Sequence, residues 1–274
     1  MREGALRKNA TRAVMYIFLI AVSLISVFPL YWSFISAFNN TQQILGGWLL
    51  PSTHLQENLQ HLFEQHNVVR ALKNSFATTL LQTFAALAVS SIAGYGFEIY
   101  HDKAKDTVMA ILMLAMMVPF VAVLVPLFQM FTKAKLINSW TGFILPSIAT
   151  PFLIMYFRNS ARSFPRDTLE AARIDGLNEF QIFIRMFIPM MKPTYASAAT
   201  ITFMNAWNAY LWPKVIMQTN EAITMPMLVA NTMGGYVIDY GVVMAAVTIC
   251  SLPTVIIFFC LQKSFTNAVA GAVK

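Results

Sequence analysis

Charged side chains are scarce in this chain. Of its 274 residues, only 11% are Asp, Glu, Lys or Arg, whereas 57% are hydrophobic, and the mean hydropathy is +0.59. A soluble domain carries about 25% charged residues, so the composition excludes an ordinary soluble fold and indicates an integral membrane protein. The hydrophobic runs are near the length of about 20 residues that a helix needs to cross a bilayer. The alternating ten-residue strands of an outer-membrane barrel are absent.

Cysteine is also scarce. The two cysteines, Cys250 and Cys260, stand ten residues apart in one hydrophobic run. On a helix this spacing is about 15 Å, which is beyond the reach of a disulfide. We expect both side chains to serve in packing.

Several chemical signatures are missing. The sequence contains no Gly-x-x-x-x-Gly-Lys-Ser/Thr phosphate-binding loop, so we do not expect this chain to bind ATP in the usual way. No hydrophobic run carries a buried acidic residue suited to a proton relay, since Glu98 lies at a boundary, and this argues against an ion-driven carrier. His54, His61 and His66 lack tight metal-ligand spacing, and no catalytic set of carboxylates or of Ser, His and Asp is present. The sequence therefore predicts neither an enzyme nor a metal site.

Six hydrophobic runs are long enough to be membrane spans. We expect an all-α membrane protein with six transmembrane helices, at residues 14–37, 74–97, 107–131, 140–158, 194–216 and 241–262. The first run is too long for a signal-peptide core, and no small-residue cleavage site follows it. We expect it to remain as an uncleaved span.

The distribution of Lys and Arg predicts the orientation. With the N-terminus inside, the inner segments hold 14 of these residues and the outer segments hold 5, which together account for all 19. Basic residues accumulate on the cytoplasmic side. We therefore expect cytoplasmic tails at 1–13 and 263–274, a transmembrane domain over 14–262, and a cytoplasmic connection at 158–193. Because the basic residues cluster beside spans, the net charge of +7 does not indicate nucleic acid as a partner.

The connection 158–193 has the marks of a capped polar helix. Pro165 suits the first turn of a helix, and Asp167 places negative charge near the positive end of its dipole. Gly176 can take the positive φ that commonly ends a helix. Asn178 with Gln181 resembles a capping box that opens a second helix.

That second helix is expected to present one continuous apolar face, made of Phe180, Phe183, Ile184, Phe187 and Ile188. Pro189 and Pro193 would end it before the fifth span. Physical reasoning alone leaves two explanations open, an ordinary elbow at the membrane surface and an element that docks on a partner.

A spacing in this loop resembles a known signature. Glu170-Ala171-Ala172, three residues, Gly176 and then Ile188-Pro189 resemble the EAA motif of the permease subunits of ABC importers. This chain has Met186 where the family usually has a branched aliphatic residue, and Ile188 where Leu is common. Both substitutions keep the apolar character.

The resemblance implies an ABC importer permease fold in a bacterial inner membrane. The loop would form a coupling helix on a nucleotide-binding subunit, and the residues carried over are Glu170, Ala171, Ala172, Asp175 and Gly176, with Arg173 and Arg166 as further contacts. The implied partners are a second, similar permease subunit, two ATPase subunits, an extracytoplasmic solute-binding protein and membrane lipid. The chain itself would hold no cofactor, because ATP and Mg²⁺ are bound by the ATPase subunits.

Further motifs resemble the carbohydrate-type permeases, similar to the maltose-system subunit. They are Asn74-Ser75, the run from Trp207 to Pro213, and the C-terminal Gly-Ala-Val-Lys at 271–274. The resemblance covers nearly the whole chain. Ala209 departs from it, since relatives often have an acid or amide there. The implied cargo is a sugar or oligosaccharide, with another neutral or polar solute, or a secondary carrier, as alternatives.

The fifth predicted span supports a neutral cargo. Asn205, Asn208 and Trp212 are spaced i, i+3 and i+7 and would share one helical face, with Asn205 about 17 Å into the span. Amides and aromatic rings suit sugar hydroxyls and C–H faces. Alternatively, the amides join helices, and Trp212 and Tyr210 are interfacial aromatics.

Two glutamines are weaker candidates for the path. Gln82 lies in the second predicted span and Gln129 in the third. Either could line the path or bridge two helices. With Asn205, Asn208, Tyr210 and Trp212 they complete the set of expected substrate-path residues.

Overall fold

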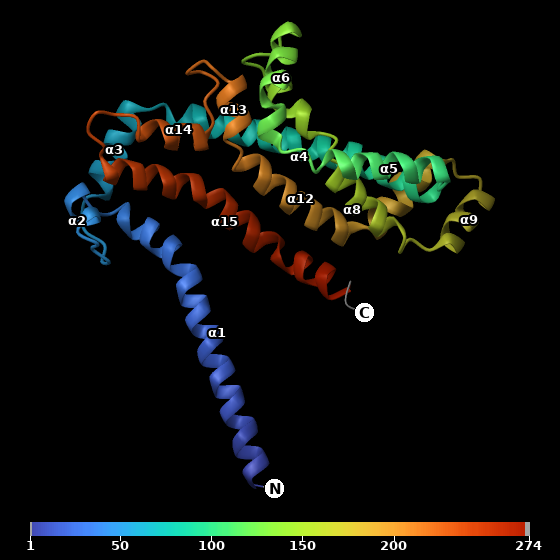
Figure 1. The fold of residues 1–274 in the computed structure, drawn as a ribbon, viewed down its shortest axis with the longest axis horizontal. Helices are drawn as coiled ribbons and strands as arrows, with labels where there is room; N and C mark the ends of the chain where they lie inside the picture. Colours follow the sequence, from blue (N-terminus) through green and yellow to red (C-terminus); the bar gives the residue numbers. More distant parts are fainter. Residues whose placement is uncertain (1, 272–274) are drawn as a thin grey trace. The chain divides into compact units, whose positions relative to one another are not determined.

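Helices make up all of the regular structure in the part of the chain described (Figure 1). The structure is a computed structural model that describes residues 2–271, with side chains described for residues 11–260. The chain forms two compact units. The first unit comprises residues 1–67 and 229–251, and the second comprises residues 68–228 and 252–274.

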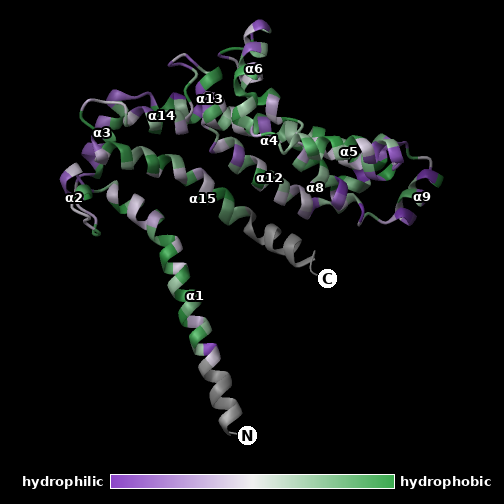
Figure 2. Ribbon diagram, viewed as in Figure 1, coloured by the Kyte–Doolittle hydropathy of each residue, from purple (hydrophilic) through white to green (hydrophobic). Residues whose placement is uncertain are grey.

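The first unit contains the apolar helix α1 (Arg2–Ser36). Its stretch Thr11–Ser36 is long and apolar enough to cross a membrane, and the rest of the chain buries none of its most apolar window. Figure 2 shows the hydrophobic colour along this stretch. The unit continues with the short helices α2 (Thr41–Leu45) and α3 (Leu55–Gln65) and with the start of α15 (Tyr240–Gly271).

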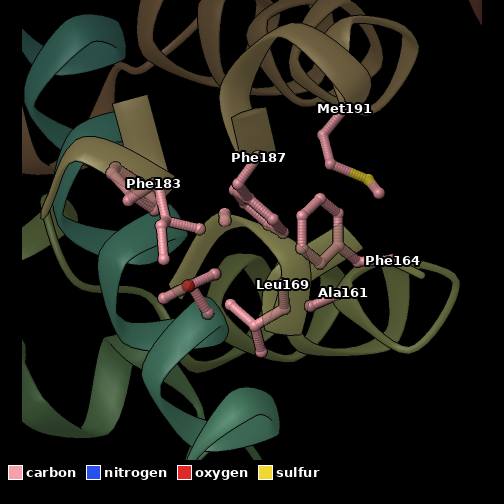
Figure 3. Packing of buried hydrophobic residues seen from close by; sticks show 9 residues of the cluster. Ala161, Phe164, Leu169, Phe183, Phe187 and Met191 are labelled. Atoms are coloured by element: carbon pink, nitrogen blue, oxygen red, sulfur yellow. The ribbon is translucent and has the colours of Figure 1, made fainter. Parts of the chain in front are cut away.

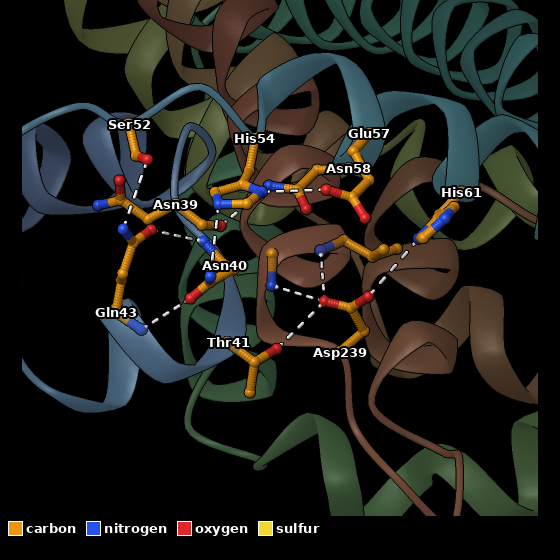
Figure 4. Close-up of polar contacts among 12 residues, drawn as sticks. Asn39, Asn40, Thr41, Gln43, Ser52, His54, Glu57, Asn58, His61 and Asp239 are labelled. Atoms are coloured by element: carbon orange, nitrogen blue, oxygen red, sulfur yellow. Dashed lines mark hydrogen bonds and ion pairs between the residues drawn. The ribbon is translucent and has the colours of Figure 1, made fainter.

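Polar contacts tie these segments together (Figure 4). Asp239 Oδ1 accepts hydrogen bonds from Gly241 N at 3.0 Å and from Thr41 Oγ1 at 3.2 Å, which satisfies an N–H group at the start of α15. Asn58, a buried residue of α3, donates Nδ2 to Asn39 O at 3.0 Å. Side-chain hydrogen bonds therefore join α2 to the start of α15, and α3 to the segment that follows α1.

The second unit is organised around the long helix α4 (Val68–Ile99), which packs along α8 (Pro151–Ala161) and α12 (Lys192–Trp207). Gly94 allows the close approach of α4 to α8. A Cβ atom at this position would lie 2.6 Å from Phe157 Cβ, so only glycine fits without displacing a helix. Small residues are common where helices of membrane proteins meet.

An ion-paired group joins three helix ends of this unit. Arg158 of α8 is only 6% exposed, and its Nη2 lies 2.5 Å from Asp106 Oδ1 in α5. Its Nε lies 3.4 Å from Glu98 Oε2 near the end of α4. Both carboxylates neutralise a guanidinium that would otherwise be costly to bury.

Shorter helices complete the second unit. They are α5 (Lys103–Ala115), α6 (Phe120–Lys133), α7 (Trp140–Ile144) with a 3₁₀ turn at Leu145–Ser147, α13 (Leu211–Ile216) and α14 (Met225–Thr232), of which α14 extends into the first unit. The loop elements α9, α10 and α11 are described with the site below.

The described residues contain three helices that are continuous and apolar enough to span a membrane, at Thr11–Ser36, Val68–Ile99 and Tyr240–Cys260. They lie at the first, second and sixth predicted spans. Two more spans are obtained if each of two bent helix pairs counts as one. The total of six stays a prediction.

The predicted spans 107–131, 140–158 and 194–216 are not single unbroken helices in the structure. The first is broken between α5 and α6 with a bend of 100°, and the second is broken before α8 with a bend of 51°. The third ends at Trp207 and resumes at Leu211. A proline lies at or just after each break, at Pro119, Pro151 and Pro213, and proline cannot supply the N–H that a continuous helix requires.

Candidate functional site

Helix α9 (Arg166–Ile174) lies where a polar helix was predicted. It begins directly after Pro165, whose missing N–H costs no hydrogen bond at that position. Asp167 stands in the first turn, near the positive end of the helix dipole. Figure 2 shows hydrophilic colours along much of this helix. The prediction of a helix here is confirmed.

Gly176 ends this helix as predicted. Its φ is +80°, a conformation that favours glycine. Leu177 N donates to Ala172 O at 3.0 Å, and Gly176 N donates to Arg173 O at 3.1 Å. These two hydrogen bonds form a Schellman motif, so the turn between the two arms of the loop has a defined geometry.

The residues expected to contact an ATPase subunit divide between two faces of α9. Arg166, Glu170, Ala171, Arg173, Asp175 and Gly176 are exposed. Ala172 is only 2% exposed and packs inward with Leu169, because residues three apart share a helical face. Our expectation that both alanines offer a close contact to a partner is wrong for Ala172, which supports α9 from within.

A buried apolar cluster holds the loop against α4 and α8 (Figure 3). The ring of Phe187 lies with its centroid 4.9 Å from that of Tyr95 and 5.6 Å from that of Phe164. Each large apolar side chain buried from water contributes roughly 1.5–3 kcal/mol, so the loop is a packed part of the fold. The cluster consists of Tyr95, Ala161, Phe164, Leu169, Ala172, Ile182, Phe183, Phe187 and Met191.

The second arm of the loop opens with the predicted capping box. Gln181 N donates to Asn178 Oδ1 at 2.9 Å, and Asn178 N donates to Gln181 Oε1 at 3.0 Å. Helix α10 (Glu179–Ile182) continues into a π-helical turn at Phe183–Phe187 and then into α11 (Ile188–Met190).

The predicted apolar face of this arm is buried only in part. Phe183 and Phe187 are buried, but Phe180 is 69% exposed and Ile184 is 44% exposed, whereas Ile182 is fully buried. The π turn closes its hydrogen bonds over five residues instead of four, so residues near it do not keep the register of a regular α-helix.

Glu179 connects α9, α10 and α4. Its Oε1 accepts from Arg173 Nε at 2.7 Å, and its Oε2 accepts from Tyr95 Oη at 3.4 Å. Burial raises the pKa of the Glu179 carboxyl, but hydrogen bonds from Arg173 and Tyr100 outweigh it and hold that pKa below its usual range. The carboxylate is therefore ionised at neutral pH.

A cavity of about 170 Å³ lies in the same unit. Its lining combines hydrogen-bonding side chains with aromatic rings, and the residues described around it carry no formal charge. They are Gln82, Phe143, Ser147, Thr150, Phe152, Leu153, Ile201, Thr202, Asn205, Ala209, Trp212 and Pro213. Such a lining can hydrogen-bond hydroxyl groups and pack against C–H faces.

Three of the six expected path residues line this cavity, namely Gln82, Asn205 and Trp212. Gln82 is nearly buried on α4. The indole of Trp212 is buried, and its Nε1 donates to the carbonyl oxygens of Gly142 and Phe143, each at 3.1 Å. These bonds hold the ring in place, so the indole can offer a surface but no free N–H.

The other three expected residues, Asn208, Tyr210 and Gln129, are exposed and lie outside the lining. The shared face of Asn205, Asn208 and Trp212 was a wrong prediction, because α12 ends at Trp207 and Asn208 follows it as the cap. Trp212 belongs to the separate helix α13.

Sequence reasoning missed several lining residues. Ser147 ends the 3₁₀ turn before the helix break, Thr150 caps α8 directly after it, and Thr202 lies on α12 one turn before Asn205. The pair Pro146 and Pro151 was a local signal for that break, since proline cannot continue a helix hydrogen-bond ladder.

The Asn74-Ser75 motif has a role in packing the second unit. Asn74 Nδ2 donates to Glu221 O at 2.8 Å and to Ile223 O at 3.0 Å. Ser75 Oγ accepts from Met225 N at 2.8 Å. The pair therefore anchors the segment before α14 to the start of α4.

Curated relatives match almost the whole chain. The lactose transport system permease protein LacG of Rhizobium radiobacter is 38% identical over 269 residues, which cover 98% of each chain. The arabinooligosaccharides transport system permease protein AraQ of Bacillus subtilis (strain 168) is 31% identical over 269 residues, which cover 96% of each.

A solved structure matches the fold. The crystal structure of a bacterial ABC transporter involved in the import of the acidic polysaccharide alginate contains a chain with a TM-score of 0.81 and 20% sequence identity, covering 93% of this chain and 96% of that one. The family model described as "Binding-protein-dependent transport system inner membrane component" matches residues 86–271, a range that holds the whole loop 158–193 and most of the cavity lining. The chain therefore belongs to the family of binding-protein-dependent transport system inner membrane components.

Proposed function

We propose that this chain is one of two membrane-spanning subunits of an ATP-driven importer for a neutral sugar or oligosaccharide. Its membership of the binding-protein-dependent family supports the importer class. Relatives whose names specify lactose and arabinooligosaccharides support the cargo class. The observation that carries the proposal is the capped polar helix α9. One side of it packs into the apolar cluster with α4 and α8, and the other side exposes charged residues.

The proposed arrangement has six spans in a bacterial cytoplasmic membrane, with both termini and the loop 158–193 in the cytoplasm, as the Lys and Arg distribution favours. A binding protein delivers the solute from outside, and two ATPase subunits close on ATP inside. Closure can drive alternating access only if the ATPase subunits bind the outward-open state more tightly than the inward-open one. The exposed residues Glu170, Ala171, Arg173 and Asp175, with Arg166, would make that contact.

The cavity supports a neutral cargo. Its lining residues, including Gln82, Thr202 and Asn205, are uncharged. An anionic or cationic solute inside a membrane protein is normally held by a charged side chain. Hydrogen-bonding groups beside the rings of Phe152 and Trp212 suit a sugar instead.

Substitutions of Gly176 test the coupling role in the reconstituted importer. Gly176→Ala places a side chain at φ +80°, which costs about 1–2 kcal/mol, enough to change a docking equilibrium by roughly tenfold. We expect uptake per ATP hydrolysed to fall by about that factor. Gly176→Asn is the matched control, because Asn tolerates positive φ and no heavy atom lies within 4 Å of a Cβ built there.

Both uptake and ATP hydrolysis are measured with purified complexes in vesicles. Equal coupling in Gly176→Ala, Gly176→Asn and the unmodified protein would remove the basis for a coupling role of this turn. Purification of the chain without any ATPase subunit would count against the importer proposal as a whole.

Cavity variants test the cargo path. Asn205→Ala and Gln82→Ala each remove a hydrogen-bonding group from the lining. We expect the KM of uptake of the preferred sugar to rise by about 5-fold, which corresponds to the loss of about 1 kcal/mol of hydrogen bonding. Gln129→Ala is the control, since Gln129 is exposed and outside the cavity. The cargo is first identified by screening neutral mono- and oligosaccharides against charged sugars.

Unchanged uptake in both cavity variants would assign these amides to helix packing. Preferential uptake of a charged solute would refute the neutral cargo while leaving the coupling proposal intact.

A further inference from the structure

The loop 158–193 contacts three helices of the second unit, α4, α8 and α12, although the chain itself connects it to only two of them. It continues directly from α8 and leads directly into α12. It contacts α4 without a chain connection. Arg158 and Arg162 both lie 3.4 Å from Glu98 near the end of α4, and aromatic rings make a second contact further from that end. Tyr95 of α4 packs edge-on against Phe183 and Phe187, at ring-centroid distances of 5.3 and 4.9 Å.

The Tyr95 hydroxyl adds a polar link to this packing. It reaches Glu179 Oε2 at 3.4 Å, while Glu179 Oε1 accepts from Arg173 Nε at 2.7 Å. One carboxylate thus joins α4 to both arms of the loop, the end of α9 and the start of α10. Hydrogen bonds to an ionised group are stronger than those between neutral groups.

Helix α4 also reaches the cavity. Gln82 lines the cavity, and Tyr95 stands thirteen residues further along the same unbroken helix, about 20 Å away at 1.5 Å per residue. If α4 moves as a rigid body, a displacement at Tyr95 also displaces the cavity wall that carries Gln82. Helix α12 reaches the cavity as well, through Thr202 and Asn205, but ends there at Trp207.

We propose that Tyr95 and Glu179 are positioning residues that make α4 move together with the loop, so that motion of α9 reaches the cavity through α4 as well as through α8 and α12. The inference rests on the proposed coupling function and specifies its route. It predicts that the hydroxyl of Tyr95, and not only its ring, matters when ATP is bound.

Spin-label distances in the assembled importer test this route without knowledge of the cargo. One label is placed on α9 at Ile174→Cys and the other on α4 at Ile92→Cys, both exposed positions, after Cys250→Ala and Cys260→Ala. In the protein that retains Tyr95 and Glu179, we expect a single distance between the labels, which is the same with and without ATP. In Tyr95→Phe, and in Glu179→Gln, we expect the same distance without ATP and a shift of about 2 Å or more with ATP.

Two further variants sharpen the result. Tyr156→Phe is the matched control, because Tyr156 lies on α8 and belongs to neither the apolar cluster nor the Glu179 group, and it should behave as the native protein. In the double variant Tyr95→Phe with Glu179→Gln, the label distance with ATP should shift no more than in the single variant with the larger shift. The reason is that both substitutions remove the same link.

The route through α4 is overturned if the native distance itself changes with ATP, if Tyr95→Phe retains the native behaviour, or if its distance already differs without ATP, which would indicate a structural role only. Failure of the coupling function itself looks different. In that case no ATPase subunit remains with the chain, or the Gly176 variants couple normally.

Discussion

At the scale of single residues, Arg158 is a buried charge of the second unit whose stability depends on its ion-pair partners. It neutralises Asp106 and the largely buried Glu98. Arg158→Met keeps the apolar stem but leaves these carboxylates with less compensation. Breaking a buried ion pair costs about 3–5 kcal/mol, and because Asp106 is half-exposed we expect about 3 kcal/mol, or a fall of roughly 5–10 °C in the midpoint of thermal unfolding in detergent.

Arg162→Met is the control for this prediction. Arg162 also lies 3.4 Å from Glu98 Oε2, but its side chain is mostly exposed, and exposed pairs contribute about 1 kcal/mol or less. Equal losses of stability in the two variants would show that burial of Arg158 is not the source of its importance.

At the scale of elements, the contact between α4 and α8 depends on one glycine. Gly94→Ala would place a Cβ 2.6 Å from Phe157 Cβ and 2.7 Å from Arg158 N, and such overpacking typically costs about 1–3 kcal/mol. We expect a lower unfolding midpoint and a lower yield of assembled importer. Gly96→Ala, two residues away on the same helix, meets no heavy atom within 4 Å and should be neutral or stabilising by up to about 1 kcal/mol. A Gly94→Ala protein as stable as Gly96→Ala would contradict the packing argument.

Local signals and distant contacts differ in how well the sequence predicts them. The end of α9 at Gly176 and the capping box of Asn178 and Gln181 were predictable, because caps depend on residues within one turn. The π turn at Phe183–Phe187 and the burial of Ala172 were not, since they depend on packing with α4 and α8. The same reason explains the cavity, which Gln82 and Asn205 both line although more than a hundred residues separate them in the sequence.

At the scale of the whole molecule, the lengths of the hydrophobic runs predict the number of spans, and the distribution of Lys and Arg predicts their orientation. Length identifies three continuous spans and two bent pairs among the described residues, whereas the excess of Lys and Arg on one set of connections predicts which ends face the cytoplasm. Helix breaks at Pro119 and Pro151 change the number of continuous spans and leave the predicted orientation unchanged. Orientation can therefore be tested independently of the number of spans.

Cysteine labelling in intact cells tests the predicted orientation. In a background with Cys250→Ala and Cys260→Ala, single cysteines are placed at Ile174 in the loop 158–193 and at Tyr236 in the connection before α15, both highly exposed side chains. A membrane-impermeant maleimide should label Tyr236→Cys in intact cells and Ile174→Cys only after the membrane is opened, because the loop carries basic residues that the positive-inside rule keeps in the cytoplasm. Labelling of Ile174→Cys from outside would place α9 on the wrong side for an ATPase subunit, and it would overturn both the orientation and the coupling role that depends on it.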